Sequence, residues 1–176
     1  MIQSKIEIKE AFEINFQSLV NFIESLDKKS FEANQNGKWS AGQQLEHLIK
    51  SVRPLNQVLL LPRLLYPLIF GKMKRIERTY EELFEKYHEK LNEGGVASSS
   101  YIPSVVKFEE RKQKLKQFNL HLAKLVNHLN ALSEKQLDTL ILPHPLLGKI
   151  SLQEMMFFTI FHTEHHLNLL QTKVSD

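Results

Sequence analysis

Apolar residues recur every three or four positions along most of this chain, and the residues that break helices are clustered between these stretches. Only six glycines and six prolines are present among 176 residues. This distribution favours helices over the frequent tight turns of an all-β domain, and no segment shows a convincing strand signal. The length fits one domain over residues 1–176, which is long enough to bury a continuous core.

The periodicity predicts four long amphipathic helices. They are expected over residues 6–26, from Ser40 to about residue 53, over 105–132 and from Ser151 to about residue 173, with a more charged helical stretch over 74–91. Four apolar stripes are most simply buried against one another in an all-α four-helix bundle. The connections between these helices leave room for additional short helices.

Side chains that cap or break helices mark several of the expected boundaries. Three pairs have the spacing of a capping box: Ser40 with Gln43, Ser133 with Gln136, and Ser151 with Glu154. A turn is expected at Asn36-Gly37, within the polar stretch that follows the first helix. Pro54 lies inside the second helical pattern and is expected to kink or end that helix near Val52 or Arg53.

The segment Val58–Phe70 reads VLLLPRLLYPLIF and is strongly apolar. It is short for a membrane span, and Pro62, Arg63 and Pro67 interrupt it. The simplest interpretation is a kinked core or connecting segment. A homodimer interface is the main alternative, because large exposed apolar patches usually meet a partner, and membrane contact is the weakest of the three.

Charge and cysteine content narrow the possible functions. The formal net charge is +3, and lysines alternate with glutamates without the concentrated basic stripe of a nucleic-acid binder. The chain has no cysteine, so a metal ion would have to be bound by His, Asp, Glu or water. The charged N-terminal stretch lacks the apolar run of a signal peptide, which makes a cytoplasmic location the expectation.

The last predicted helix carries a pair of histidines four residues apart. His162 and His166 follow Met155 and Thr159 on the stripe that is expected to face the bundle interior. Side chains at this spacing have Cβ atoms about 5–6 Å apart, so both imidazoles can reach one ion. The spacing suits zinc and similar metals. Such pairs also occur on helices without a metal, and the pair alone leaves the question open.

A third ligand has to come from another helix. His47 is the best candidate, although it lies on the flank of the Leu45/Leu48/Val52 stripe, and periodicity alone places it at the solvent edge. His165 points about 100° away from His166 on a straight helix and cannot share its role.

Three runs in the chain resemble elements of one known family. Residues 39–48 read WSAGQQLEHL, residues 144–149 read HPLLGK, and residues 162–167 read HTEHHL. In this order, they resemble the W-S-x-x-(E/Q)-x-L-x-H-L, HP-x-x-G-K and H-x-x-H-H elements of the DinB-like metalloprotein superfamily. The resemblance covers the second helix and the last third of the chain, and the region between them carries no matching motif.

The resemblance implies a four-helix bundle in which His47, His162 and His166 bind one divalent metal ion. Members of the family are associated with nickel, zinc, iron or manganese, and many form homodimers. Some branches are linked to S-transfer from low-molecular-weight thiols such as bacillithiol or mycothiol, and others are described as metal-dependent hydrolases. Relatives often carry a glutamine at the position of Leu169, so the contribution of that glutamine is lost or relocated here.

Several other polar residues are candidates for a role near the metal ligands. Gln43 either orients His47 or caps its helix, and His144 either reaches the pocket or stabilises its turn. His165 is a further candidate for assisting the reaction at the site. Glu46 and Glu164 lie beside the ligands in sequence, and each is expected to be solvated rather than to act as a general base. Trp39 is expected to pack under the end of the bundle.

Three histidine ligands leave a metal position open, as in catalytic sites. That position suits either a water for hydrolysis or a thiol for S-transfer to a small-molecule substrate. The expected function is therefore a metal-dependent enzyme, with S-transfer slightly ahead of hydrolysis on the family resemblance. A non-catalytic metal or small-ligand binding module and a dimeric interaction protein are the alternatives.

Overall fold

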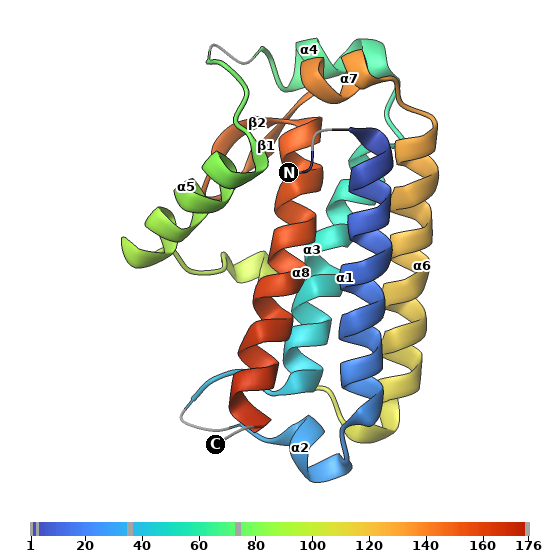
Figure 1. Cartoon of the computed structure of the whole chain (residues 1–176), viewed down its shortest axis with the longest axis vertical. Coiled ribbons are helices and arrows are strands. Elements are labelled where there is room, and N and C mark those ends of the chain that lie inside the picture. Colours follow the sequence, from blue (N-terminus) through green and yellow to red (C-terminus); the bar gives the residue numbers. More distant parts are fainter. Residues whose placement is uncertain (1, 3, 35–36, 73–74, 175–176) are drawn as a thin grey trace.

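The computed structural model describes residues 2, 4–34, 37–72 and 75–174. The bundle consists of four long helices: α1 (Lys5–Ser25), α3 (Ala41–Val58), α6 (Arg111–Asn130) and α8 (Leu152–Val174). Helix α1 packs against α8, and α3 packs against α6. Figure 1 shows the four helices side by side along the long axis of the molecule. This arrangement confirms the all-α four-helix bundle expected from the sequence.

Short helices occupy the connections, as expected. They are α2 (Lys28–Glu32), η1 (Arg63–Leu65), α4 (Tyr66–Ile69), α5 (Tyr80–Asn92), η2 (Ser99–Tyr101), η3 (Phe108–Glu110) and α7 (Glu134–Thr139). The three predicted capping boxes are all present, at the starts of α3, α7 and α8. The residues expected to form a turn include Asn36, which lies outside the described part of the chain.

Two helices begin later than the periodicity predicted. Helix α5 starts at Tyr80 rather than near residue 74, because Thr79 caps it and forms a capping box with Glu82. Residue 74 itself lies outside the described residues. Helix α6 starts at Arg111 rather than residue 105, after the 3₁₀ turn Phe108–Glu110.

The prediction that Pro54 ends or kinks the second helix near residue 52 or 53 was wrong about its end, because α3 continues to Val58. Proline removes one backbone hydrogen bond, and contacts beyond it compensate for the loss. Leu55 is buried in the core, and the Asn56 side chain donates to the backbone oxygen of His121 on α6 at 2.9 Å. These contacts hold the last turn of α3 in place.

The absence of strands was also a wrong expectation. Strands β1 (Ile141–His144) and β2 (Gly148–Ser151) form an antiparallel hairpin, in which Ile141 pairs with Ser151 and His144 with Gly148. Each strand has only four residues, and β1 contains a proline, so neither carries a recognisable alternating pattern. Gly148 closes the hairpin with a φ of 73°, a conformation that favours glycine.

The apolar segment Val58–Phe70 forms the connection that contains η1 and α4. Tyr66 is buried, and its hydroxyl donates to the backbone oxygen of Val58 at 2.9 Å. Three leucines of the segment are largely exposed: Leu60, Leu64 and Leu68. In the part of the chain that the structure describes, no helix has the length and hydrophobicity needed to cross a membrane.

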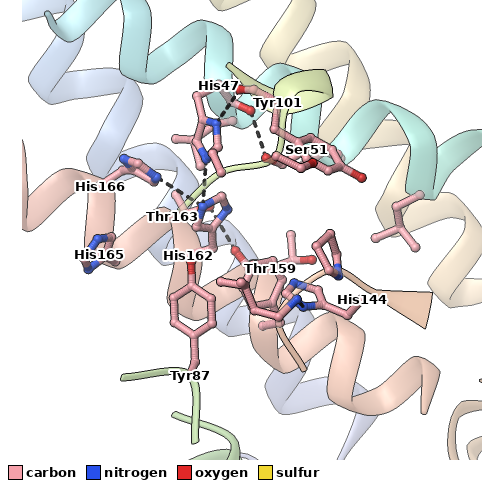
Figure 2. A pocket seen from close by; sticks show the side chains of 18 of the residues that line it. His47, Ser51, Tyr87, Tyr101, His144, Thr159, His162, Thr163, His165 and His166 are labelled. Atoms are coloured by element: carbon pink, nitrogen blue, oxygen red, sulfur yellow. Dashed lines mark hydrogen bonds between the residues drawn. The ribbon is translucent and has the colours of Figure 1, made fainter. Parts of the chain in front are cut away.

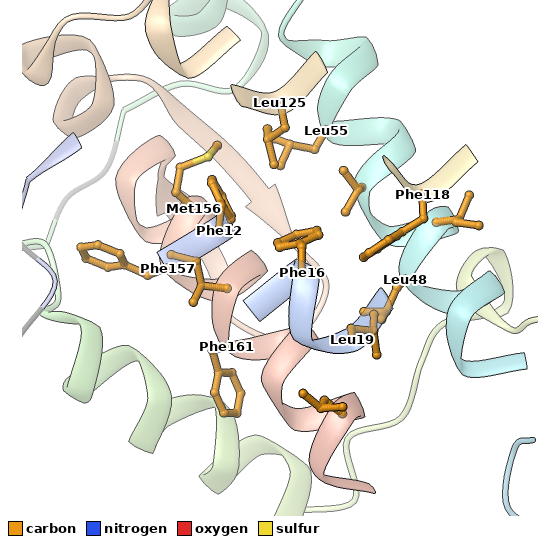
Figure 3. Packing of buried hydrophobic residues seen from close by; sticks show 14 of the residues in the cluster. Phe12, Phe16, Leu19, Leu48, Leu55, Phe118, Leu125, Met156, Phe157 and Phe161 are labelled. Atoms are coloured by element: carbon orange, nitrogen blue, oxygen red, sulfur yellow. The ribbon is translucent and has the colours of Figure 1, made fainter. Parts of the chain in front are cut away.

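Aromatic side chains from different helices meet in the centre of the bundle (Figure 3). The ring of Phe16 on α1 stacks on Phe118 of α6 with their centroids 5.0 Å apart, and Phe12 meets Phe16 edge to face at 5.5 Å. Leu48 of α3 and Leu125 of α6 are fully buried beside them. The apolar core therefore joins α1, α3 and α6 without using any histidine.

A buried carboxylate fixes the start of α8. Glu154 is fully buried and accepts hydrogen bonds from the backbone N–H of Ser151 at 2.8 Å and of Arg78 at 3.0 Å. Arg75 Nη2 donates to the same carboxylate at 2.7 Å. Nearby, the Ser151 hydroxyl donates to Glu77, whose pKa is raised to about 7, mainly by burial. This network ties residues 75–78, which precede α5, to the helix that carries the paired histidines.

Candidate metal centre

Three buried histidine side chains from two helices converge on one point. The Nε2 atom of His162 lies 3.1 Å from Nε2 of His47 and 3.1 Å from Nε2 of His166. Within the described residues, this trio is the group of metal-ligating side chains whose ligand atoms all lie within 4.8 Å of one another. Figure 2 shows the rings of His47 and His166 directed toward His162 from two sides.

Carbonyl oxygens orient two of these rings. His47 Nδ1 lies 2.8 Å from the backbone oxygen of Tyr101, and His166 Nδ1 lies 3.0 Å from Oε1 of Gln44. A carbonyl oxygen can only accept, so each ring donates from Nδ1, and a neutral ring then has a bare lone pair on Nε2. Partners of this kind commonly fix the orientation of metal-ligating histidines.

The protonation of the trio suits a cation at its centre. Burial lowers the pKa of His47, and it holds the pKa values of His162 and His166 well below their usual range, so the three rings are neutral near pH 7. A single proton on His162 Nε2 can satisfy only one of the two neighbouring lone pairs well. At least one buried acceptor is thus left without a donor, and a bound cation would satisfy it. The donor set of three neutral imidazoles fits a divalent metal such as zinc.

Gln44 is the side chain outside the trio that most directly supports it. Its amide nitrogen donates to the backbone oxygen of Trp39 at 3.4 Å, which leaves Oε1 facing His166. We expect Gln44→Ala to weaken metal affinity by about 10- to 100-fold, because His166 loses the partner that fixes its tautomer and orientation. Titration against a chelating metal indicator would measure the change.

The neighbouring amide provides the control for this prediction. Gln43 caps α3 through Ser40 and does not contact the trio. Gln43→Ala should therefore leave metal affinity within about twofold of the unaltered protein. Equal losses in the two variants would show that the effect comes from the helix start and not from the orientation of His166.

The trio lies in the wall of a large cavity between α3, α5 and α8. The cavity has a volume of about 720 Å³, which is the size of a small-molecule site. Most of its described lining residues are apolar, and none of them is Asp, Glu or Arg. Figure 2 shows Tyr87 entering from α5 with its hydroxyl directed toward His162. Burial raises the pKa of Tyr87 to about 12, so this hydroxyl keeps its proton at neutral pH.

His144 lines the cavity and also stabilises its turn, so it fits both of the roles considered for it. Its Nδ1 accepts from the backbone N–H groups of Leu146 at 3.2 Å and Leu147 at 3.1 Å, which places the proton of the neutral ring on Nε2. Burial lowers its pKa to about 4, so the ring stays neutral. His165 also lines the cavity, but it lies outside the trio and faces His88, with ring centroids 6.3 Å apart.

Two residues lie elsewhere than expected. Trp39 does not simply pack under the bundle end, because its ring lies 4.9 Å from that of His47 and lines the cavity. Glu46 is not a solvated residue, because it is buried and pairs with Lys114 of α6 at 2.7 Å. Glu164 is exposed, as expected. Neither carboxylate lines the cavity, so neither contacts a molecule bound there.

The sequence interpretation missed three residues: Gln44, Tyr87 and Tyr101. Gln44 lies three residues before His47 and therefore on the same side of α3, and this spacing was the available signal. Tyr87 and the backbone oxygen of Tyr101 come from the part of the chain without a matched motif, and only the tertiary structure brings them to the site.

Comparison with known proteins agrees with the four-helix fold. The sequence pattern of the DinB superfamily matches residues 11–170. No protein of curated function matches the chain. A solved structure described as "YfiT from Bacillus subtilis is a probable metal-dependent hydrolase with an unusual four-helix bundle topology" is similar, with a TM-score of 0.63 and 16% identity over 99% of this chain and 91% of that one. At this identity the likeness shows a shared fold. Because the family pattern spans most of its length, the chain belongs to the DinB superfamily.

Proposed function

We propose that this protein is a metal-dependent enzyme that hydrolyses a small neutral molecule bound in the cavity. His47, His162 and His166 would hold one divalent ion; the candidates are nickel, zinc, iron and manganese, of which imidazole ligands suit the first three best. The observation that carries the proposal is the convergence of three buried Nε2 atoms on the wall of a 720 Å³ cavity. An ion held by three neutral histidines keeps open positions and acts as a Lewis acid toward a water or a thiol.

Hydrolysis is supported by the donors beside the trio. Negative charge develops on the carbonyl oxygen when an ester or amide is attacked, and neutral donors in a dry site stabilise that charge. The Tyr87 hydroxyl and the protonated Nε2 of His144 belong to residues that line the cavity, and both groups stay neutral at pH 7. The similar Bacillus subtilis protein is itself described as a probable metal-dependent hydrolase.

Thiol S-transfer is the second candidate, and a different observation favours it. No carboxylate lines the described part of the cavity, so there is no Asp or Glu to take a proton from an attacking water. A thiol has a pKa near 8.5 and loses its proton far more easily than water does. It therefore has less need of a carboxylate base.

Turnover assays on untagged protein test the proposal. The protein would be loaded with each candidate metal and assayed against a panel of neutral esters and amides, and separately against thiol–electrophile pairs. Metal-dependent hydrolysis that is lost in His166→Ala is the expected result. Turnover only with thiols would establish S-transfer instead. One metal per chain without any turnover would indicate a non-catalytic binding module.

Tyr87→Phe is expected to lower kcat by about 10- to 100-fold with little change in KM. The variant removes one hydroxyl that donates to charge in the transition state, and such donors typically contribute factors of this size or larger. Metal content should stay at one ion per chain, because Tyr87 is not a ligand. Steady-state kinetics on the best ester of the panel would measure the effect.

Tyr80→Phe is a matched control for this prediction. Tyr80 lies on the same helix, and burial also raises its pKa to about 12. Its ring packs against Phe157 at 5.7 Å and does not line the cavity. A similar loss of kcat in both variants would attribute the effect to the packing of α5 and would exclude Tyr87 as a donor.

A further inference from the structure

One side of the cavity continues well past the histidine trio. Val52, Leu55 and Val58 line it on successive turns of α3, and Val58 lies about 16 Å beyond His47 along the helix axis. Met155 of α8 lines the same side, about 10 Å before His162. Leu142 of β1 and Phe70 also line this end of the cavity. We call this part of the cavity, lined by Val52, Leu55, Val58, Phe70, Leu142 and Met155, the apolar arm.

The hydroxyl groups near the apolar arm have no proton to offer a ligand. Each of these hydroxyls donates to a backbone oxygen four residues earlier: Ser51 to His47 at 2.9 Å, Thr159 to Met155 at 2.8 Å, and Thr163 to Thr159 at 3.0 Å. The one lysine among the described lining residues, Lys38, lies at the other end of the cavity, where it precedes Trp39 and α3. The arm therefore offers a ligand apolar contact and almost no polar recognition.

An elongated, uncharged space of this kind selects for a hydrocarbon chain. Each methylene that moves from water into it gains binding free energy, whereas a charged or hydrogen-bonding group would lose its hydration without a partner. A compact polar molecule would leave the arm unused. Figure 2 shows Ser51, Thr159 and His144 on the side of the trio opposite His165, which is the side on which the arm begins.

We propose that the substrate is a neutral aliphatic acyl compound, an ester or amide of a straight-chain fatty acid. Its carbonyl group lies at the trio and its chain lies in the apolar arm. The position of the carbonyl rests on the proposed function. The position of the chain rests on the cavity alone, so the two parts can fail separately.

Binding of straight-chain alcohols to metal-free protein tests the chain site without any catalysis. Isothermal titration calorimetry would compare 1-butanol, 1-hexanol, 1-octanol and 1-decanol with protein stripped of metal by EDTA. We expect the Kd to fall by about fourfold for each added methylene until the arm is full. A Kd that does not depend on chain length would overturn the proposal.

Two variants at one position locate the chain. Val58→Phe fills the far end of the arm and should stop the gain in affinity at a shorter alcohol, whereas Val58→Ala should extend the gain to a longer one. Val126→Phe is the matched control, because Val126 is also a partly buried valine but does not line the cavity. Circular dichroism would show that each variant folds. Identical chain-length series in Val58→Phe and Val126→Phe would refute the assignment.

The same series separates this inference from the proposed function. Chain-length dependence in a protein that shows no metal-dependent turnover would support the chain site and count against the hydrolase. Turnover of short neutral esters together with a flat alcohol series would support the hydrolase and refute the aliphatic substrate.

Discussion

His162→Ala is expected to abolish stoichiometric metal binding while leaving the bundle folded. His162 is the middle member of the trio, with its Nε2 atom 3.1 Å from Nε2 of both other histidines. Without it, two neutral imidazoles remain, and the ion loses one of its three protein ligands. The core around Phe16 and Phe118 contains none of the trio, so the helices should persist.

The readouts are metal content and the thermal stability that metal confers. Elemental analysis should fall from one ion per chain to less than about a tenth. For the unaltered protein, free metal at 100 times its Kd stabilises the folded state by about 2.7 kcal/mol, and this gain should vanish in the variant. Far-UV circular dichroism would confirm that the helices are retained.

His165→Ala is the control for His162→Ala. It removes a histidine from the same helix that lies outside the trio. Metal content and metal-dependent stability should be unchanged in this variant. One tightly bound ion per chain in His162→Ala would refute the site assignment, and loss of metal in His165→Ala would require a different ligand set.

Local periodicity was sufficient to predict the bundle but not its connections. The four long helices follow the 3.6-residue repeat of their apolar residues, which is encoded within each segment. The hairpin of β1 and β2 has no such repeat, because its strands are too short and they are held by packing against α7 and α8. Continuation of α3 through Pro54 likewise depends on contacts that Leu55 and Asn56 make with other parts of the fold.

The residues of the candidate site also differ in how far the local sequence predicts them. His162 and His166 share one stripe of a single helix, so their spacing was enough to bring them together. His47 lies on a flank of α3 that periodicity assigns to solvent, and the resemblance to the DinB-like family supplied it. That flank is buried because α8 and the turn η2 pack against it, with the backbone oxygen of Tyr101 2.8 Å from His47 Nδ1. This burial depends on tertiary contacts, which a local sequence pattern does not encode.

Glu154→Ala is expected to lower the free energy of unfolding by about 2–4 kcal/mol, because each donor that loses a buried acceptor costs about 1–3 kcal/mol. The variant leaves the guanidinium of Arg75 without its partner at 2.7 Å, and it removes an acceptor from the backbone N–H groups of Arg78 and Ser151. Urea denaturation followed by circular dichroism would measure the change. Glu154→Gln keeps the size of the side chain and one acceptor oxygen, so its loss should be smaller.

Glu164→Ala is the matched control, because Glu164 lies on the same helix and is exposed. Its effect should stay within about 0.5 kcal/mol. A loss below about 1 kcal/mol in Glu154→Ala would show that water replaces the carboxylate without penalty. With the expected loss, residues 75–78 would separate from α8 more readily, which would let α5, and Tyr87 with it, shift relative to His162. Turnover in Glu154→Gln should then fall more than metal content does, because the three ligands lie on α3 and α8 and Tyr87 lies on α5.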